Sequence, residues 1–258
     1  MGILNVCPDS FSDGGLYLDP EKAVYRALEM QEEGADIIDI GGQSTRPGSL
    51  PISTDEELKR VVPVLKKLVG KINVPISIDT YSSRVAYQCL LLGANIINDI
   101  SGLRFSHDMA DVIAKFNACV VIMHIKGTPK DMQNNPEYED LFVEIIGYLK
   151  NQIEVAEKAG ISQIIIDPGI GFGKRLEHNL QIIANLDKFK VLGKPILIGT
   201  SRKSFIGTIL DLPPKERLEG TIASICVSIL KGANIVRVHD VLSVKRAVSI
   251  VDAIIREG

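Results

Sequence analysis

Three segments of the chain repeat one pattern: a glycine and an alanine, then a short apolar run, then a polar ending. They read GADIIDIGGQ at residues 34–43, GANIINDISG at 93–102 and GANIVRVHDV at 232–241. Glycine is typical of the turn that ends a helix, and a short apolar run is typical of a buried strand. The repetition therefore predicts a unit of helix, turn and strand that recurs along the chain.

Short apolar runs that fit buried strands occur about eight times. Their expected ranges are 3–6, 36–40, 75–79, 95–100, 119–124, 163–167, 195–199 and 235–239. The segments between them have helical spacing and helical caps. Asp19 and Pro20 suit the start of one helix, and Ser53 with Glu56 forms a possible capping box at another. Pro63 is expected to kink that second helix.

Nearly continuous apolar strands that each precede a helix are typical of a parallel sheet buried on both faces. Eight such units in 258 residues match an α/β fold of the (β/α)8 TIM barrel type in number and length. A doubly wound open sheet is the weaker alternative. We expect a single barrel domain over residues 1–258, with the glycine turns at its bottom and the strand ends at its top. The chain opens on the first strand, so either the bottom is less covered or further residues precede it.

Composition argues against several classes of partner and site. The net charge is −3 and Lys and Arg are scattered, which argues against nucleic acid. Cys7, Cys89, Cys119 and Cys226 are isolated in sequence, which argues against a zinc site and for a reduced, cytoplasmic protein. No apolar run approaches the ~20 residues that a membrane helix requires, so we expect no membrane partner.

Polar residues end most of the expected strands. Ionised groups inside a core are costly unless they are paired, so such residues need a reason beyond packing. Active sites of TIM barrels lie where the strands end. The residues expected at this top face are Asn5, Asp39, Asp79, Asn98, Asp99, His124, Asp167, Lys203, Arg237 and His239.

Three acceptor-bearing residues, Asp79, Asn98 and Asp167, would converge on one apolar barrel end. They need a partner rich in hydrogen-bond donors, and a nitrogen heterocycle is such a partner. His124 has two interpretations, a contact to substrate or a hydrogen bond that holds a turn.

Four polar residues are left outside the expected site. Asp39 and Asp99 are equally well explained by hydrogen bonds to neighbouring loop amides. His107 and His178 are expected to be solvated surface groups.

The loops after the first two strands are polar and are candidates for lids over a substrate. In the first, Asp9 and Asp13 lie near Asn5 and supply oxygen ligands for a Mg²⁺ that also takes phosphate oxygens. In the second, Arg46 is a fork-shaped donor for phosphate. With basic residues at the eighth strand, these loops favour a small ligand that carries a diphosphate.

The glycine-rich segment PGIGFGK, residues 168–174, fits neither common nucleotide motif. A phosphate loop needs Gly where Pro168 stands and Ser or Thr where Arg175 stands, and the dinucleotide spacing is also wrong. The glycines are expected to permit a sharp strand exit and a close backbone approach to a flat ligand.

The chain resembles dihydropteroate synthase, the folate-pathway enzyme family one of whose substrates is mimicked by sulfonamide drugs. The resemblance covers essentially the whole chain. It rests on the motifs MGILNVCPDSFSDGG, DIGGQSTRPG, SIDT, IIND, MHIKG, IIIDPGIGFGK, GTSRKSFIG and RVHDV, in this order. Cys7 stands where the family usually has Thr and Gln43 where it usually has Glu, and Thr200 occupies a position that is more often small or apolar.

The resemblance implies a role for each matched position. Pterin contacts are implied for Asp79, Asn98, Asp167 and Lys203, and a Mg²⁺ contact is implied for Asn5. Positions near the pyrophosphate or the second substrate are Thr45, Arg46, Arg237 and His239, and Asp13 belongs to a mobile first loop. Residues similar to those lining the p-aminobenzoate pocket are Pro47, Phe172 and Ser204.

The implied reaction joins 6-hydroxymethyl-7,8-dihydropterin diphosphate to p-aminobenzoate and gives 7,8-dihydropteroate and pyrophosphate. The family also suggests a homodimer through late helices such as residues 221–231, although core packing explains their apolar residues equally well. A pterin-binding methyltransferase on the same barrel and an inactive pterin-binding regulatory subunit are the two alternatives.

Overall fold

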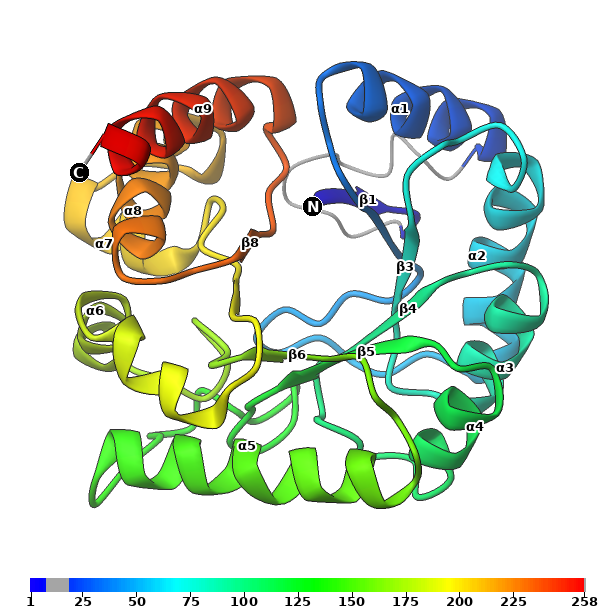
Figure 1. Ribbon diagram of the computed structural model, residues 1–258, viewed down its shortest axis with the longest axis horizontal. Coiled ribbons are helices and arrows are strands. Elements are labelled where there is room, and N and C mark those ends of the chain that lie inside the picture. The colour runs from blue at the N-terminus through cyan, green and yellow to red at the C-terminus, as the bar shows by residue number, and fades with distance from the viewer. Residues whose placement is uncertain (8–18, 258) are drawn as a thin grey trace.

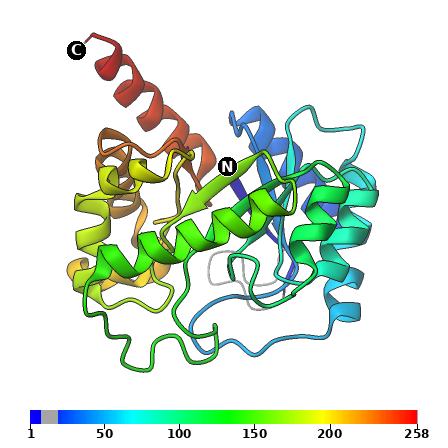
Figure 2. The same cartoon turned by 60° about the horizontal axis from the view of Figure 1, so that its bottom comes forward.

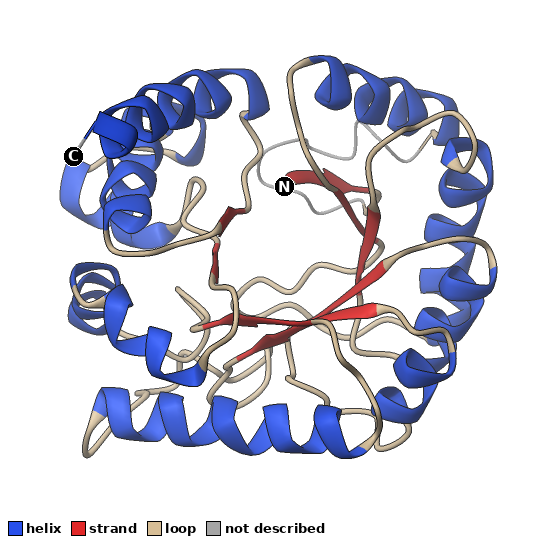
Figure 3. Ribbon diagram, viewed as in Figure 1, coloured by secondary structure: helices blue, strands red, loops and turns tan. Residues whose placement is uncertain are grey.

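The eight expected strands all form, each within three residues of its expected bounds. The computed structural model describes residues 1–7 and 19–257 of the chain. The strands are β1 (Gly2–Asn5), β2 (Ile38–Gly41), β3 (Ile76–Asp79), β4 (Ile96–Asp99), β5 (Cys119–Met123), β6 (Ile164–Asp167), β7 (Leu197–Ile198) and β8 (Ile235–Val236). They lie at the centre of the molecule, and helices surround them (Figure 1, Figure 3).

The strands close into a barrel. β1 to β6 are parallel neighbours in chain order, and β7 pairs with β8 in the same sense. Isolated bridges join the two sheets, one between Ile166 and Ile196 and one between Gly2 and Val238. The second bridge includes a hydrogen bond of 2.9 Å from Ile3 N to Val238 O. The TIM barrel predicted from the sequence is confirmed, and the open sheet is excluded.

The two helices for which the sequence predicts a cap begin at that cap. They are α1 (Pro20–Glu32), α2 (Thr54–Leu68), α3 (Ser83–Leu91), α4 (Met109–Lys115), α5 (Leu141–Lys158), α6 (Leu176–Ala184), α7 (Ser204–Leu210), α8 (Leu218–Leu230) and α9 (Val241–Glu257), with 3₁₀ turns η1 (Leu186–Leu192) and η2 (Pro214–Glu216). Asp19 Oδ1 accepts from Glu21 N at 2.9 Å, and Ser53 Oγ accepts from Glu56 N at 3.2 Å. These bonds satisfy first-turn amides that lack a partner inside the helix. The α2 helix continues through Pro63 without a break.

The repeated glycine turns connect helices to strands at the bottom of the barrel. Gly34, Gly93 and Gly232 have φ values of 95°, 109° and 104°, a region that residues with a side chain rarely adopt. After each, the alanine N–H donates to a carbonyl five residues earlier, as in the bond from Ala94 N to Cys89 O at 3.0 Å. This is the Schellman ending of a helix, and it explains the glycine.

The asparagine that follows two of these turns has a structural role. Asn95 Oδ1 accepts from Ile76 N, and Asn234 Oδ1 accepts from Ile196 N, both at 2.9 Å. Each side chain thus satisfies a backbone amide at the start of a neighbouring strand. The GAN pattern therefore sets the position of paired strands at the bottom.

Side chains inside the barrel form layers, because alternate residues of a strand point to the same face. A bottom apolar cluster contains Met1, Ile96, Val121, Ile165 and Leu197. Near the strand ends the register pairs Asn5 with Gly41, Gly41 with Asp79, and Asp79 with Asn98. The polar residues therefore share one layer at the top of the barrel.

Across residues 1–7 and 19–257, no helix is both long enough and apolar enough to cross a membrane.

Candidate active site

An ion-pair network connects four strands at the top of the barrel. Arg237, just after β8, donates through Nε to Asp39 Oδ2 at 2.6 Å and through a terminal nitrogen to Asp79 Oδ2 at 2.8 Å. Asn98 Nδ2 donates to the same oxygen of Asp39 at 3.1 Å. Asp39 is fully buried and Asp79 nearly so, with 8% of its surface exposed. One guanidinium thus compensates two carboxylates that lie out of contact with bulk water.

Burial controls the charges of this network. Burial raises the pKa of Asp79 to about 7, an effect that Arg237 opposes and the Asp39 carboxylate reinforces. The pKa of Arg237 is raised, because attraction to Asp39 and Asp79 outweighs the effect of its own burial. Within the described residues, Asp39 Oδ1 and Asp79 Oδ1 accept no hydrogen bond. A buried acceptor without a donor is costly, so this layer is suited to a ligand that donates.

Asp167 ends β6, and Lys203 lies in the loop after β7, directly before α7. Asp167 Oδ1 accepts from Gly169 N at 2.7 Å. Lys203 Nζ donates to the Ile170 carbonyl and lies 4.8 Å from the centre of the Phe172 ring. Burial lowers the pKa of Lys203 to about 8, and the Asp167 carboxylate opposes that shift. Burial likewise raises the pKa of Asp167, opposed by Lys203. The two groups form an acceptor and a donor side by side.

Side-chain donors fix the carbonyls of the glycine-rich loop 168–174. Gln133 Nε2 donates to Gly171 O and Tyr138 OH donates to Gly173 O, both at 2.7 Å. Lys174 Nζ donates to Phe172 O at 3.0 Å. Together with the bond from Lys203 to Ile170 O, four successive carbonyls have a side-chain partner. The loop is therefore a fixed platform for Phe172.

Two of its glycines make room for neighbouring protein backbone, so the expected approach to a flat ligand is not their explanation. A Cβ on Gly169 would lie 1.9 Å from His124 O, and one on Gly173 would lie 2.4 Å from Lys126 O. Their φ values of 73° and 66° also require glycine. The loop after β5 thus occupies the space that side chains here would take. The sharp strand exit that the sequence predicted is present.

His124 holds this junction together. Its Nδ1 lies 2.8 Å from Lys174 Nζ, and both side chains are buried. Its ring meets Tyr148 edge-on, with centroids 4.8 Å apart. Burial, then the positive charge of Lys174, holds the pKa of His124 well below its usual value. These contacts favour the turn-holding interpretation over a substrate contact.

His239 and its neighbours join the loops after β7 and β8. Its Nδ1 lies 2.9 Å from Ser201 Oγ. Arg202 donates through Nε to Asp240 Oδ2 at 2.9 Å and through a terminal nitrogen to Oδ1. Burial, followed by the nearby charges of Arg237, Arg202, Arg46 and Lys203, lowers the pKa of His239 to about 3. The ring is therefore neutral at pH 7 in a strongly basic environment.

The loop after β2 carries three predicted residues. Ser49 Oγ donates to Arg46 O at 2.7 Å, and Gly48 N donates to Pro129 O at 2.9 Å, which connects this loop to the one after β5. Thr45 and Arg46 are half-buried, whereas Pro47 is exposed. Phe172 is half-buried, and Ser204 is exposed at the first position of α7.

Asn5 ends β1 beside Gly41. A Cβ built on Gly41 would lie 3.6 Å from Asn5 Oδ1 and 3.7 Å from Asp79 Oδ2, so the glycine leaves the space between these oxygens open. Asp9 and Asp13, predicted near it, lie outside the described residues. In the described part of the chain, no group of three or more His, Cys, Asp or Glu residues is arranged to hold a metal.

Comparison with known proteins decides the family. A sequence model of pterin binding enzymes matches residues 1–239. Dihydropteroate synthase of Bacillus subtilis is 48% identical over 262 residues, which cover 100% of this chain and 89% of that relative. The chain belongs to the dihydropteroate synthase family.

Solved structures of dihydropteroate synthases agree. The enzyme of Yersinia pestis in a sulfonamide drug complex matches with a TM-score of 0.97 at 43% identity, covering 100% of this chain and 94% of that one. The enzyme of Xanthomonas albilineans with 4-aminobenzoic acid matches with a TM-score of 0.91 at 41% identity, covering 98% and 92%.

Two of the departures from the usual dihydropteroate synthase pattern are buried and hydrogen-bonded. Gln43 Nε2 donates to Tyr81 OH at 2.5 Å, and Thr200 Oγ1 accepts from Ser224 Oγ at 2.9 Å. Cys7 is buried beside β1. All three substitutions are therefore accommodated by the packing.

Of the four residues left outside the site, two behave as expected and two do not. Asp99 accepts from Ser101 N at 2.7 Å and Leu103 N at 3.0 Å, which confirms its loop-holding role. His107 is exposed, as expected. The prediction for His178 was wrong, because its Nδ1 accepts from Arg175 N at 3.2 Å and its ring packs edge-on against Tyr138.

The loop-amide explanation of Asp39 was wrong. Its partners are Arg237 and Asn98 rather than loop amides. Sequence reasoning placed Asp39 late in its strand at the top face but did not pair it with those residues. The available signal was its spacing of two residues from Gly41 at the strand end. This spacing puts Asp39 on the inner face of the barrel, one layer below Gly41.

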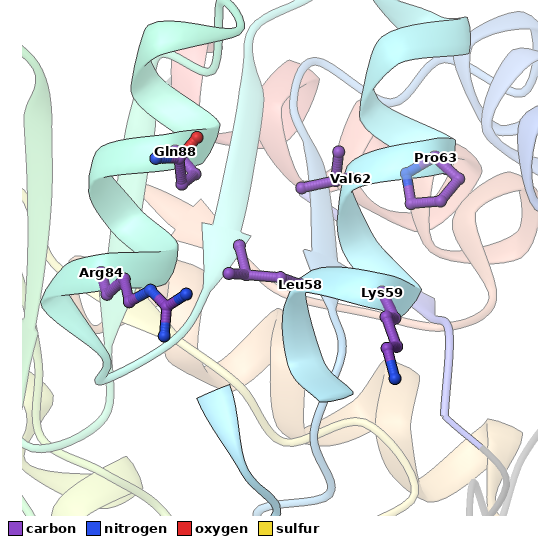
Figure 4. Close-up of a pocket in the computed structure, with 6 residues that line it drawn as sticks. All are labelled: Leu58, Lys59, Val62, Pro63, Arg84 and Gln88. Carbon is purple, nitrogen blue, oxygen red and sulfur yellow. The ribbon is translucent and has the colours of Figure 1, made fainter. Parts of the chain in front are cut away.

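A separate groove lies between α2 and α3 on the helical layer (Figure 4). Leu58, Lys59, Val62 and Pro63 of α2 face Arg84 and Gln88 of α3 there. Arg84 also pairs with Asp55 at 2.9 Å. None of the predicted site residues lines this groove, so it is distinct from the top of the barrel.

Proposed function

We propose that this chain catalyses the synthase reaction, joining 6-hydroxymethyl-7,8-dihydropterin diphosphate to p-aminobenzoate with release of pyrophosphate. The observation that carries the proposal is the arrangement at the top of the barrel. Among the described residues, Asp39 Oδ1 and Asp79 Oδ1 accept no hydrogen bond, and both carboxylates pair with Arg237. The charges of Arg237 and Lys203 also act on His239. The carboxylate oxygens suit a ring rich in hydrogen-bond donors, and the basic side chains suit a diphosphate.

The pterin ring is bound by the acceptor layer. Asp79 and Asp167 accept from the aminopyrimidine edge, Lys203 donates to ring heteroatoms, and Asn98 completes the edge contacts. Support comes from the raised pKa of both carboxyl groups, which reflects burial that a ring with N–H donors would compensate. Asp39 orients Arg237 from below.

The diphosphate is bound on the basic side. Arg237, His239, Arg46 and Thr45 lie around the position of the leaving group. Negative charge develops on that group as the C–O bond breaks, so donors aimed at it stabilise the transition state more than the ground state. Asp13, which the family resemblance assigns to this step, lies outside the described residues.

Mg²⁺ fits at Asn5. This cation takes one or two protein oxygens and completes its shell with water and substrate phosphate, so a full protein cage is not required. The open space between Asn5 Oδ1 and Asp79 Oδ2 beside Gly41 meets that need. When bound, Mg²⁺ would neutralise part of the diphosphate charge.

The second substrate, p-aminobenzoate, is held by Phe172, Pro47 and Ser204. Its arylamine is already a nucleophile near neutral pH, so the protein needs to position it rather than deprotonate it. The fixed carbonyls of loop 168–174 give Phe172 a defined place for this role. The relative from Xanthomonas albilineans, with its bound 4-aminobenzoic acid, is consistent with such a subsite.

We also propose a cytoplasmic homodimer formed through α8 and α9. The end of α9 projects beyond the rest of the molecule (Figure 2). Val227 and Leu230 of α8 and Ile250 and Ile254 of α9 are exposed apolar side chains. Exposed apolar area of this kind favours association. Sedimentation analysis of the intact chain and of Ile254→Glu tests it, since a dimer must dissociate when a charge enters the interface.

Product analysis tests the reaction itself. Purified protein is given the dihydropterin diphosphate, p-aminobenzoate and Mg²⁺, and 7,8-dihydropteroate is sought by mass spectrometry. The proposal predicts its formation. Methyl transfer from a methylated reduced pterin without dihydropteroate would favour the methyltransferase alternative, and pterin binding without any product would favour a regulatory subunit.

A further inference from the structure

One hydroxyl group determines the hydrogen-bonding state of His239. Ser201 Oγ accepts from the backbone N of His239 at 3.2 Å and lies 2.9 Å from Nδ1 of the same residue. Ser201 is buried, and no other hydrogen bond of its Oγ is formed to the described residues. A serine hydroxyl has one hydrogen to donate. The backbone N–H cannot accept that hydrogen, and among the described residues Nδ1 is the acceptor within its reach, so the hydrogen points to Nδ1.

This direction fixes the tautomer of the ring. If Nδ1 accepts, a neutral imidazole carries its hydrogen on Nε2. The opposite arrangement, with Nδ1 donating, would leave the buried Ser201 hydrogen without an acceptor, which is costly. The doubly protonated ring is disfavoured as well, by burial and by the cations around it.

A neighbouring ion pair holds the serine and the histidine together. Arg202 and Asp240, which directly follow Ser201 and His239 in the chain, form a two-point contact. Arg202 N also donates to Thr221 Oγ1 of α8 at 3.0 Å. The loops after β7 and β8 are therefore tied at two adjacent positions, so Ser201 cannot move away from the ring without breaking the pair.

We propose that Ser201 is a positioning residue that keeps His239 as a neutral donor through Nε2, aimed at a diphosphate oxygen. This inference rests on the proposed function. Arg237, Lys203 and Arg46 already supply positive charge to this region. A neutral donor adds a directed hydrogen bond without adding repulsion among them.

Nitrogen-15 NMR of the whole chain labelled at histidine tests the tautomer directly. The His239 signals are assigned by their loss in His239→Gln. At pH 7 the ligand-free protein is expected to show hydrogen on Nε2 and none on Nδ1, and Ser201→Ala to show a mixture. Ser228→Ala is the matched control, since its buried hydroxyl donates only to Ser224 O, at 2.7 Å, within α8. Hydrogen on Nδ1 in the unaltered protein would overturn the proposal.

Binding of inorganic pyrophosphate with Mg²⁺, measured by calorimetry, tests the consequence. The glutamine amide reaches the position of Nε2 and the asparagine amide that of Nδ1. His239→Gln should retain affinity within about threefold, while His239→Asn and Ser201→Ala lose about three- to tenfold or more. Equal affinities of His239→Gln and His239→Asn, or unchanged affinity in Ser201→Ala, would contradict it.

The proposed function and the proposed role of Ser201 can fail separately. If the unaltered protein makes no dihydropteroate, the proposed function is wrong whatever the NMR spectrum shows. If it makes dihydropteroate but carries the hydrogen on Nδ1, only the role of Ser201 is wrong.

Discussion

The bottom and the top of this barrel are built by the same strands and follow opposite rules. In β4, Ile96 belongs to the bottom apolar cluster, and Asn98, two residues later on the same face, belongs to the site. In β6, Ile165 and Asp167 make the same change. A step of two residues therefore separates side chains that stabilise the fold from side chains that we propose bind the substrate.

The energetic difference between the two ends is large. Bottom residues gain about 25 cal/mol for each Å² of apolar surface removed from water. At the top, Asp39 and Asp79 lose hydration, and Arg237 only partly offsets that loss. The comparison teaches that stability is concentrated below and binding capacity above, and the following variants are designed to separate the two.

Arg237→Met should have the largest effect. It leaves two buried carboxylates unpaired and is expected to lower the free energy of unfolding by about 3–5 kcal/mol. Turnover should fall by about 10²–10³-fold through loss of leaving-group stabilisation. Urea denaturation and steady-state kinetics measure both. Arg246→Met, at an exposed position of α9, is the control, and a loss of stability no greater than in that control would contradict the network.

Leu197→Ala tests the bottom of the barrel. It removes a fully buried side chain and should lower the free energy of unfolding by about 2–4 kcal/mol. The KM values of the folded enzyme should stay unchanged, because the cavity lies away from the substrates. A change in pterin KM at a temperature where the variant is fully folded would break the separation of the two ends.

Lys203→Ala should weaken substrate binding and leave stability nearly unchanged, the opposite of Leu197→Ala. Loss of a charged donor from the ring site is expected to weaken binding of the pterin diphosphate by about 1.5–3 kcal/mol. Stability should change little, because the variant removes both the cost of burial that lowers the pKa of Lys203 to about 8 and the opposing attraction to Asp167. Calorimetry compares it with Lys215→Ala, an exposed lysine, and equal affinities would remove Lys203 from the site.

His239→Gln should have the smallest effect, and one that depends on pH. The folded-state pKa of His239 is about 3 and its ordinary value is 6.5. Below pH 6.5 the unfolded chain therefore binds a proton that the folded protein excludes, and stability is lost as the pH falls. The variant lacks this loss and should gain about 1–2 kcal/mol relative to the unaltered protein between pH 7.5 and pH 5. If the free energy of unfolding of the variant and of the unaltered protein changed with pH in the same way, His239 would not be held neutral.

The sequence predicted the strands closely, because each is a short apolar run between a glycine turn and a polar ending. It also predicted Asp79, Asn98 and Asp167 as one group, since parallel strands end at the same face, and the family resemblance added Lys203. The contact of Asp39 with Arg237 was missed because the height of a residue inside the barrel depends on the register of its strand. The register pairs Asp39 with Ser77 rather than with Asp79.

Contacts between loops could not be predicted. The bonds from Ser201 to His239 and from Arg202 to Asp240 join residues 38 positions apart. The glycines of loop 168–174 were expected to approach a flat ligand, but Gly169 and Gly173 approach the backbone of His124 and Lys126. Local patterns show that space is needed there and do not show what fills it.

The most direct measurement of the central claim is pyrophosphate release by the purified protein given the dihydropterin diphosphate and Mg²⁺, with and without p-aminobenzoate. The account predicts release that depends on p-aminobenzoate, matches dihydropteroate formed and is lost in Arg237→Met but not in Arg246→Met. Tight pterin binding with no such release would contradict it.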